Sequence, residues 1–418
     1  MLRRVKRKFN FCKFLITVIC LVSLGLFFLI NNILSIEKND NNFDIINNND
    51  NKFEDVEESI QYYSASLVMV GDNLIHSSVY KDAYKNGIYD FRGMYDLVKP
   101  IVSEYDLAYY NQETILGGSE LGVSDYPRFN SPYEVGDAMI DAGFNMVSLA
   151  SNHTIDKGER AVINSFNYWN SKSDVLAVGS YNSFDSRNSI DIREVNNISY
   201  TMLNYTYGTN GLPVPGGKEY LVNVWPVNGN DPSNDSKYQS YKNQVRKDIE
   251  AVRDSVDVLM VAMHWGVEYT HEPTVYEKDM ASYLASLGVD IIIGTHPHVI
   301  QPIEWIDDTL VIYSLGNFIS AQYQNKSTCI NYKCVVGLMS SLEIHKIVKG
   351  EDVIIDINNV DNDLVYTYYK NWRNFKVVPF SNSEIGKYLP NYRFVYDTYK
   401  NIVQKYDSSI SVKPLGGY

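Results

Sequence analysis

Most histidines of this 418-residue chain come directly after hydrophobic segments. The clearest stretch is IIIGTHPHVIQP (residues 291–302), in which two of the seven histidines flank Pro297. Acidic and amide side chains follow other hydrophobic segments in the same way. The residues at these places are Asp72, His76, Asn111, Glu113, Asn152, His153, His264, His296, His298 and Asn317. Imidazole nitrogens together with carboxylate and amide oxygens suit Mn, Fe or Zn ions, so the pattern predicts a metal site.

The hydrophobic segments have the length and the polar boundaries of buried strands, and helix-like segments lie between several of them. The predicted strands are 65–70, 105–110, 145–150, 198–205, 256–263, 289–294 and 309–315, and the predicted helices are 134–143, 158–170, 236–255 and 276–288. Strands that alternate with helices indicate a layered α/β fold. Ligands of such sheets gather beyond the carboxyl ends of the strands, so we expect the polar residues to meet at one edge.

The candidate ligands outnumber those that one ion requires. The set Asp72, Glu113, Asn152, His264, His296 and His298 would serve two ions that share a bridging carboxylate. Two ions about 3.5–4 Å apart are the common apparatus of phosphoester hydrolysis. A single His or Asn after a strand is more often a residue that favours a turn than a ligand. Turn preference does not explain why several histidines follow strands at the same edge of the sheet, so we interpret the set as functional. We expect His271 and His345 to be structural.

The N-terminus has the pattern of an uncleaved signal anchor. Residues 1–13 contain six Lys or Arg and no acid, and residues 14–30 form an uncharged run of 17 residues. At 1.5 Å per residue this run spans roughly 26 Å, and residues 31–34 can complete a membrane span. No small-x-small cleavage site follows it. The basic flank predicts a single-pass protein of the cell membrane with a cytoplasmic N-terminus and an extracellular C-terminal domain.

Charge and cysteine usage suit a domain outside the cell. Residues 1–34 hold six of the 37 basic residues and none of the 50 acidic ones, so the remainder carries a net charge of −19. We therefore expect no nucleic-acid partner, and an anionic substrate would need a local positive site such as a bound metal. Cys329 and Cys334 have the spacing of a small-loop disulfide, and no further ligands for a zinc pair stand nearby.

Six motifs of the chain resemble the capsule-synthesis CapA family, a branch related to the calcineurin-like metallophosphoesterases. In chain order they are MVGDNLIH (69–76), NQET (111–114), SLASNHTIDKG (148–158), MHWGVEYTHEPT (263–274), GTHPHVIQPIEW (294–305) and IYSLGNFI (312–319). The resemblance implies a four-layer α/β/β/α sandwich of the metallophosphoesterase type with a metal centre at one sheet edge. Here the sandwich would be preceded by one transmembrane helix.

The same resemblance implies a role for each candidate. The first ion would be bound by Asp72 and His298, the second by Asn152, His264 and His296, and both by Glu113. His153 would lie beside the reacting phosphate as the catalytic residue, and His76, Asn111 and Asn317 are further candidates for binding metal or substrate. The wider family has D-x-H at its first strand, whereas His76 lies four residues after Asp72, and N-x-E replaces the usual second motif.

We expect five parts along the chain. They are a cytoplasmic basic flank (1–13), a transmembrane signal anchor (14–34), a disordered tether rich in Asn, Asp and Glu (35–60), a metallophosphoesterase-like CapA domain (61–345) and a C-terminal extension (346–418). Tyr-rich segments of the last part have no pattern that assigns them to helix or strand.

The function that we favour is metal-dependent hydrolysis by a membrane-anchored protein of capsule, poly-γ-glutamate or other cell-envelope polymer biosynthesis. Poly-γ-glutamate is implied by the resemblance alone. The expected partners are the membrane, an anionic surface polymer or its precursor, and subunits of a polymer synthase. One alternative is a non-catalytic component of a synthase complex that binds or exports the polymer. Another is a phosphodiesterase that acts on polymers like teichoic acid.

Overall fold

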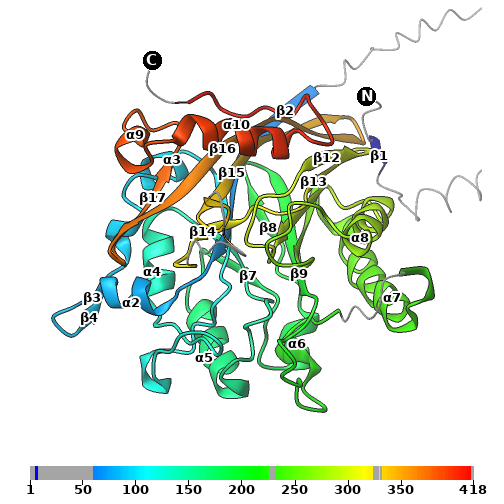
Figure 1. Cartoon of the computed structure of the whole chain (residues 1–418). Coiled ribbons are helices and arrows are strands. Elements are labelled where there is room, and N and C mark those ends of the chain that lie inside the picture. The colour runs from blue at the N-terminus through cyan, green and yellow to red at the C-terminus, as the bar shows by residue number, and fades with distance from the viewer. Residues whose placement is uncertain (1–4, 8–59, 226–231, 323–328, 330–331, 416–418) are drawn as a thin grey trace, which may run out of the picture. The chain divides into compact units, whose positions relative to one another are not determined.

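The computed structural model describes residues 5–7, 60–225, 232–322, 329 and 332–415 (Figure 1). The described residues form two compact units. The larger unit includes the described residues from Tyr63 to Lys346 and from Ile355 onward, and the candidate site lies entirely within it. In the smaller unit, strand β1 (Val5–Arg7) pairs antiparallel with residues 352–354.

The first sheet of the larger unit brings together segments that are far apart in the sequence. Its described strands follow the order β16-β15-β2-β5-β6-β7, with β14 beside β2 and β17 beside β16. Their bounds are β2 (Ile60–Asn73), β5 (Leu107–Asn111), β6 (Met146–Ser148), β7 (Leu176–Val178), β14 (Asn317–Ile319), β15 (Val336–Lys349), β16 (Asp352–Lys370) and β17 (Arg373–Pro379). The central strand β2, blue in Figure 1, runs parallel to both β5 and β14.

The second sheet has the order β12-β13-β11-β10-β9-β8. Its strands are β8 (Arg193–Val195), β9 (Ile198–Thr206), β10 (Val258–His264), β11 (Ile291–Thr295), β12 (Ile303–Ile306) and β13 (Thr309–Ile312). The four inner strands are parallel, whereas β8 and β12 pair antiparallel at the two edges. Parallel strands covered on both faces are apolar throughout, which is why β10 and β11 read as continuous hydrophobic runs.

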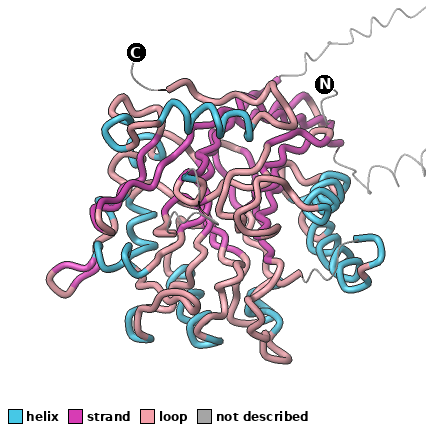
Figure 2. The backbone as a smooth tube through the Cα atoms, in the orientation of Figure 1, coloured by secondary structure: helices cyan, strands magenta, loops and turns pink. Residues whose placement is uncertain are grey.

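Helices cover the outer face of each sheet, as the cyan and magenta segments of Figure 2 show. The first sheet packs against α2 (Ser77–Ala83), α3 (Lys99–Val102), α4 (Glu134–Asp141) and α5 (Gly158–Asn170). The second packs against α7 (Ser236–Glu250) and α8 (Val275–Ser286). Several short elements complete the chain. The β3–β4 ribbon (Tyr84–Lys85 and Ile88–Tyr89) follows α2, and α6 (Phe184–Asn188) follows β7. The helices α9 (Ile385–Tyr388) and α10 (Tyr392–Val403) follow β17.

The inner faces of the two sheets share one apolar core. In β2, Leu67 and Met69 belong to this shared core, whereas Val68 and Val70 pack with the helices. Side chains of a strand point alternately to opposite faces, and β10 alternates in the same way between the shared core and the helices α7 and α8. The larger unit therefore has helix, sheet, sheet and helix layers in a mixed α/β fold.

Every predicted strand and helix overlaps an element of its kind, but one segment needs a correction. Residues 309–315 are not a single strand. Strand β13 ends at Ile312, and the chain crosses to the first sheet, where Asn317 begins β14 beside Asp72. The crossing requires glycine at Gly71, because a Cβ atom there would lie 1.8 Å from the carbonyl oxygen of Gly316.

The predicted terminal parts are only partly within the described residues. The predicted membrane anchor (14–34) lies outside them, as does the predicted tether except for Ile60, where β2 begins. Among the helices that the structure describes, none is long and apolar enough to cross a membrane. The predicted boundary at 345 falls inside β15, and the unassigned residues beyond it form β16, β17, α9 and α10. Cys329 and Cys334 form the predicted disulfide.

Candidate metal centre

The carboxyl ends of the parallel strands bring the predicted residues to one place. Asp72 is next to last in β2, Asn111 ends β5 and His264 ends β10. The others follow strand ends directly: Glu113 after β5, Asn152 and His153 after β6, and His296 and His298 after β11. All of these side chains are buried, which removes them from water and strengthens the electrostatic interactions among them.

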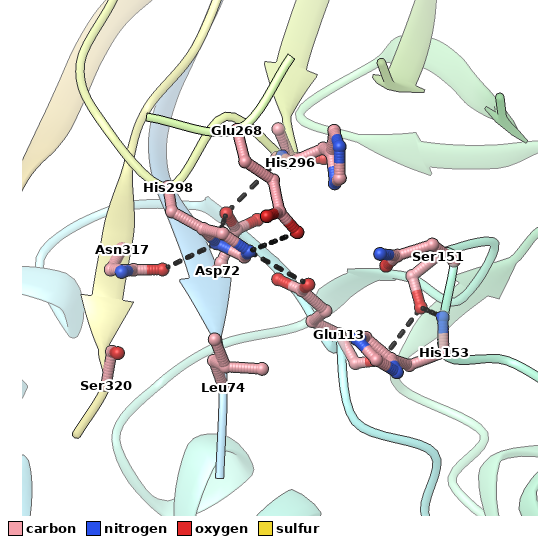
Figure 3. A network of polar contacts seen from close by, with 12 residues as sticks. Asp72, Leu74, Glu113, Ser151, His153, Glu268, His296, His298, Asn317 and Ser320 are labelled. Atoms are coloured by element: carbon pink, nitrogen blue, oxygen red, sulfur yellow. Dashed lines mark hydrogen bonds and ion pairs between the residues drawn. The ribbon is translucent and has the colours of Figure 1, made fainter. Parts of the chain in front are cut away.

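Asp72, Glu113 and His298 form the first cluster of potential metal ligands (Figure 3). One ligand atom from each residue lies within 4.8 Å of the other two. His298 Nδ1 is 3.1 Å from Asp72 Oδ2, and His298 Nε2 is 3.5 Å from Glu113 Oε1. Burial alone would lower the pKa of His298, but the carboxylates of Glu113 and Asp72 outweigh it and raise this pKa to about 10. A proton thus supplies the positive charge that a metal ion would replace.

Glu113, His264 and His296 form the second cluster, again with ligand atoms within 4.8 Å of one another. His264 Nε2 lies 3.0 Å from Asn152 Oδ1, so the amide oxygen of Asn152 faces the same place. Burial lowers the pKa of His264 and the pKa of His296 well below the usual value. Both imidazoles are therefore neutral near pH 7, which is the form that binds metal.

Glu113 belongs to both clusters, and its surroundings test whether a cation fits. Neither of its carboxylate oxygens has a hydrogen-bond partner among the described residues, although the side chain is fully buried. Burial raises the pKa of Glu113 well above its usual range, and the charge of His298, whose Nε2 lies 3.5 Å from Glu113 Oε1, opposes this rise only in part. His296 Nδ1 also has no hydrogen-bond partner in the described part of the chain. Divalent cations would give both groups the partners that they lack, so these residues fit a two-ion centre.

The turn between β11 and β12 holds both of its histidines in left-handed backbone conformations. The φ angles are 94° at His296 and 58° at His298. A residue other than glycine costs of order 1–3 kcal/mol in such a region and stays there only where its surroundings fix it. The His296 N–H donates to Asp72 Oδ2 at 3.3 Å, which ties the turn to β2. The strained turn presents both imidazoles to the clusters that contain Glu113.

Two predicted residues, Asn111 and Asn317, contact the ligand residues and orient them. Asn111 Nδ2 donates to Asp72 Oδ1 at 2.8 Å, while Asn111 Oδ1 accepts from the Ser148 hydroxyl. Asn317 Oδ1 lies 3.0 Å from His298 Nδ1. Partners of this kind fix the rotamer and tautomer of a metal ligand and raise its affinity.

His76 belongs to neither cluster. Its Nδ1 accepts from the Ala321 N–H at 3.3 Å, and its ring packs edge-on against Phe129. Burial lowers the pKa of His76 to about 4. The two histidines expected to be structural lie elsewhere: His271 contacts the Ile300 carbonyl oxygen at 2.7 Å, and His345 pairs with Glu343.

His153 adjoins the clusters without belonging to either of them (Figure 3). Its backbone N–H donates to the Ser151 hydroxyl, which in turn donates to the carbonyl oxygen of Glu113. Its Nδ1 lies 2.7 Å from Asp156 Oδ2, an oxygen that also accepts from the Phe129 N–H at 2.7 Å. The carboxylate of Asp156 therefore orients the imidazole, and reasoning from the sequence missed this residue.

Glu268 is a second residue that the sequence analysis did not single out. Its carboxylate forms a third group of potential ligands with His296 and His298, one histidine from each cluster. Glu268 Oε1 is 4.0 Å from His298 Nε2, and its side chain is 44% exposed, unlike the buried Glu113. Glu268 lies beside His296 and His298 (Figure 3), and its exposure places it on the solvent side of the two clusters. Its place in the HWGVE motif, four residues after His264, was the available signal.

Known proteins resemble parts of this chain. The PGA biosynthesis protein CapA of Bacillus subtilis (strain 168) is 27% identical over 182 residues, which cover 44% of this chain and 44% of that protein. The capsule biosynthesis protein CapA of Bacillus anthracis is 27% identical over 188 residues, 44% of this chain and 42% of that protein. The chain therefore spans less than half of the length of these curated relatives.

The chain also resembles a solved structure and matches a protein family. The structure of a putative 5'-nucleotidase from Staphylococcus aureus in complex with alpha-ketoglutarate aligns with a TM-score of 0.41 at 15% identity, over 80% of this chain and 58% of that one. The family described as bacterial capsule synthesis protein PGA_cap matches residues 66–322, which include every ligand of both clusters. The chain belongs to this family of bacterial capsule synthesis proteins.

Proposed function

We propose that this chain is a metal-dependent hydrolase that acts in the biosynthesis of a capsule or another anionic cell-envelope polymer. The observation that carries the proposal is the shared position of Glu113, a buried carboxylate that lies in both ligand clusters and has no hydrogen-bond donor among the described residues. A protein that only packed this region would have no reason to bury such a group, because its desolvation is costly.

The residues of the chain have distinct parts in the proposed reaction. Asp72 and His298 would hold one ion, His264, His296 and the Asn152 oxygen the other, and Glu113 both. Bound divalent ions polarise an ester and activate water. Asp156 holds His153 Nδ1, so the opposite nitrogen, Nε2, is the one that can give a proton to the leaving oxygen. Glu268, on the solvent side, would limit how an anionic substrate approaches.

The proposed substrate is an ester of phosphate, or a related acyl group, within a surface polymer or its precursor. The two Bacillus relatives are named for biosynthesis of a capsule and of PGA, which supports a polymer of this kind, and poly-γ-glutamate is the specific candidate. The proposed alternative is a component of a synthase complex that binds the polymer without cleaving it. A second alternative is a phosphodiesterase that acts on teichoic-acid-like polymers.

We also propose that the chain is anchored in the cell membrane with its large domain outside the cell. The support is the basic flank and the apolar run of residues 14–30 in the sequence, whereas the pairing of Val5–Arg7 with residues 352–354 requires both segments to lie on one side of the membrane. Proteases added to intact cells should then remove the domain. A domain that is cleaved only after cell lysis would contradict this topology.

The test of the enzyme proposal combines metal analysis with a substrate screen on the full chain in detergent. We expect bound Mn, Fe or Zn and metal-dependent hydrolysis of a chromogenic phosphodiester or carboxylic ester, both lost in Glu113→Gln. Metal binding without turnover on any ester, together with retained binding of an anionic polymer, would favour the non-catalytic alternative.

A further inference from the structure

A cavity beside His153 is lined by two basic side chains that have no partner among the described residues. Its volume is about 450 Å³, and its lining includes Arg128, Asp156, Lys157 and Glu159. Arg128 is exposed and Lys157 is half-buried. Neither side chain makes a hydrogen bond or an ion pair with another residue in the part of the chain that the structure describes. Unpaired cations are ordinary on an open surface, but these two share one concave space.

The acidic residues of the same cavity already have partners. Glu159 pairs with Lys218 at 2.5 Å. Asp156 Oδ2 accepts hydrogen bonds from His153 and from the Phe129 backbone, whereas Asp156 Oδ1 is buried without a hydrogen-bond partner among the described residues. Neither Arg128 nor Lys157 pairs directly with a described acidic residue of the cavity, although the whole chain has a net charge of −13. An unneutralised guanidinium and ammonium in a concave space attract an oxyanion from solution.

Backbone contacts connect this cavity to the candidate catalytic residue. Asp156 lines the cavity and orients His153 through a 2.7 Å contact with Nδ1. Phe129, the residue after Arg128, donates its N–H to Asp156 and packs its ring edge-on against His153. A ligand held by Arg128 would therefore be bound by the residue that precedes Phe129 in the chain. Because Phe129 contacts both Asp156 and His153, binding in the cavity and proton transfer at His153 depend on the same contacts.

We propose that Arg128 and Lys157 form an anion-binding subsite for a negatively charged group of the substrate next to the group that is cleaved. The proposal rests on the proposed function, because it assigns a substrate class to the same centre. The chemistry recognised is an oxyanion, which a carboxylate or a phosphodiester can supply. A substrate with charges repeated along its length would place one charge in the subsite and present the neighbouring bond to His153.

The test measures binding of three dye-labelled probes of equal length by fluorescence anisotropy. The probes are an oligoglutamate, an oligo(glycerol phosphate) and an uncharged oligoglutamine. The protein is the full chain in detergent, freed of metal by a chelator and dialysed, so that the metal centre does not contribute. The variants are Arg128→Gln, Lys157→Gln and their double. The matched control is R246Q/K247Q, which removes one Arg and one Lys charge from the exposed side of α7.

We expect one of the anionic probes to bind and oligoglutamine not to bind. Each single variant should weaken binding about threefold to fivefold and the double about tenfold or more, whereas the control should bind as the wild type does. Whichever anionic probe binds identifies the group as carboxylate or phosphodiester. Equal binding by the double variant and the wild type, or equal binding of all three probes, would overturn the subsite. Ester hydrolysis retained in that case would leave the proposed function standing, and charge-dependent binding without any hydrolysis would remove the function but keep the subsite.

Discussion

The carboxamide oxygen of Asn317 lies 3.0 Å from Nδ1 of His298, and the other end of the amide explains why. Asn317 Nδ2 donates to the carbonyl oxygen of Cys334 and to Gln322 Oε1, both at 2.8 Å. A carbonyl oxygen can only accept, so the amide must present its oxygen to His298. The imidazole therefore keeps a proton on Nδ1, so Nε2, which faces Glu113 and Glu268, is the nitrogen that would lose its proton to bind a metal.

The first prediction follows from this orientation. Asn317→Ala should weaken metal binding about 10–100-fold, because the partner that fixes the tautomer of His298 is lost while the ligands stay. Titration calorimetry with Mn²⁺ measures the effect, and circular dichroism checks that the fold is retained. The control is Gln322→Ala, which removes a partner of Asn317 but leaves the Cys334 carbonyl to hold the amide. Equal affinities of the two variants would contradict the role of Asn317.

The second prediction concerns the residue common to both clusters. The wild-type chain should hold about two ions, and Glu113→Ala should lose most of both because a bridging carboxylate contacts each ion. Glu268→Gln should lose less metal, since this side chain is exposed and stands at the margin of the clusters. Elemental analysis after dialysis gives the counts.

The control for this series is His271→Ala, which removes an imidazole bound to a backbone carbonyl away from the clusters. It should keep the wild-type metal content. The same metal content in Glu113→Ala and His271→Ala would show that Glu113 does not bridge.

The strands that carry the site could be predicted because they are parallel and covered on both faces. Such strands are continuous apolar runs, as β10 and β11 are, and a polar residue after each run marks the ligand edge. Strand β16 is long and half-buried over much of its length. Its mixture of Tyr, Asn and acidic residues has neither a clear period of two nor a long apolar run, so no pattern assigned it.

The sequence analysis missed Asp156 and Glu268 and misplaced Asn317, each for a physical reason. Asp156 acts through a contact three residues along a turn, which has the same sequence pattern as any polar turn residue. Glu268 lies on an exposed loop, where acidic residues are common. Asn317 was predicted at a strand end but instead begins β14, because residues 313–316 are buried while they cross between the sheets. Because no charged residue separates residues 313–316 from the strand before them, the sequence of the crossing reads as a continuation of that strand.

A pH-dependent stability is the third prediction, and it concerns Glu277 at the start of α8. Burial raises the pKa of Glu277 to about 7, although the Thr274 N–H donates to its carboxylate and Lys278 lies nearby. The folded state therefore keeps a proton that the unfolded state releases near pH 4.5. The free energy of unfolding should fall as the pH rises from about 4.5 to about 7, by up to about 3 kcal/mol.

Glu277→Gln removes this titration while keeping an oxygen for the Thr274 N–H. The variant should match the wild type at pH 4.5 and be more stable at pH 8, as measured by urea unfolding of metal-free protein at both values. Glu250→Gln, which changes an exposed acid at the end of α7, should show no such difference. A Glu277→Gln variant that is destabilised equally at both pH values would mean that the carboxylate is needed for the helix cap alone.

The fourth prediction separates proton donation by His153 from substrate positioning. His153→Ala should keep its metal, since the imidazole belongs to neither ligand cluster. It should lose about 10²–10⁴-fold in turnover on esters with poor leaving groups, which corresponds to ~3–5 kcal/mol of barrier. With nitrophenolate as the leaving group the loss should be much smaller, because that anion leaves without a proton.

Asp156→Asn should show the same dependence on the leaving group with a smaller loss, because the amide still contacts Nδ1 but stabilises the imidazolium less than the carboxylate does. Steady-state turnover on a series of aryl and alkyl esters, with metal content measured in parallel, gives the dependence for each variant. Equal losses across the series with metal retained would assign His153 to substrate positioning, and loss of metal would make it a ligand.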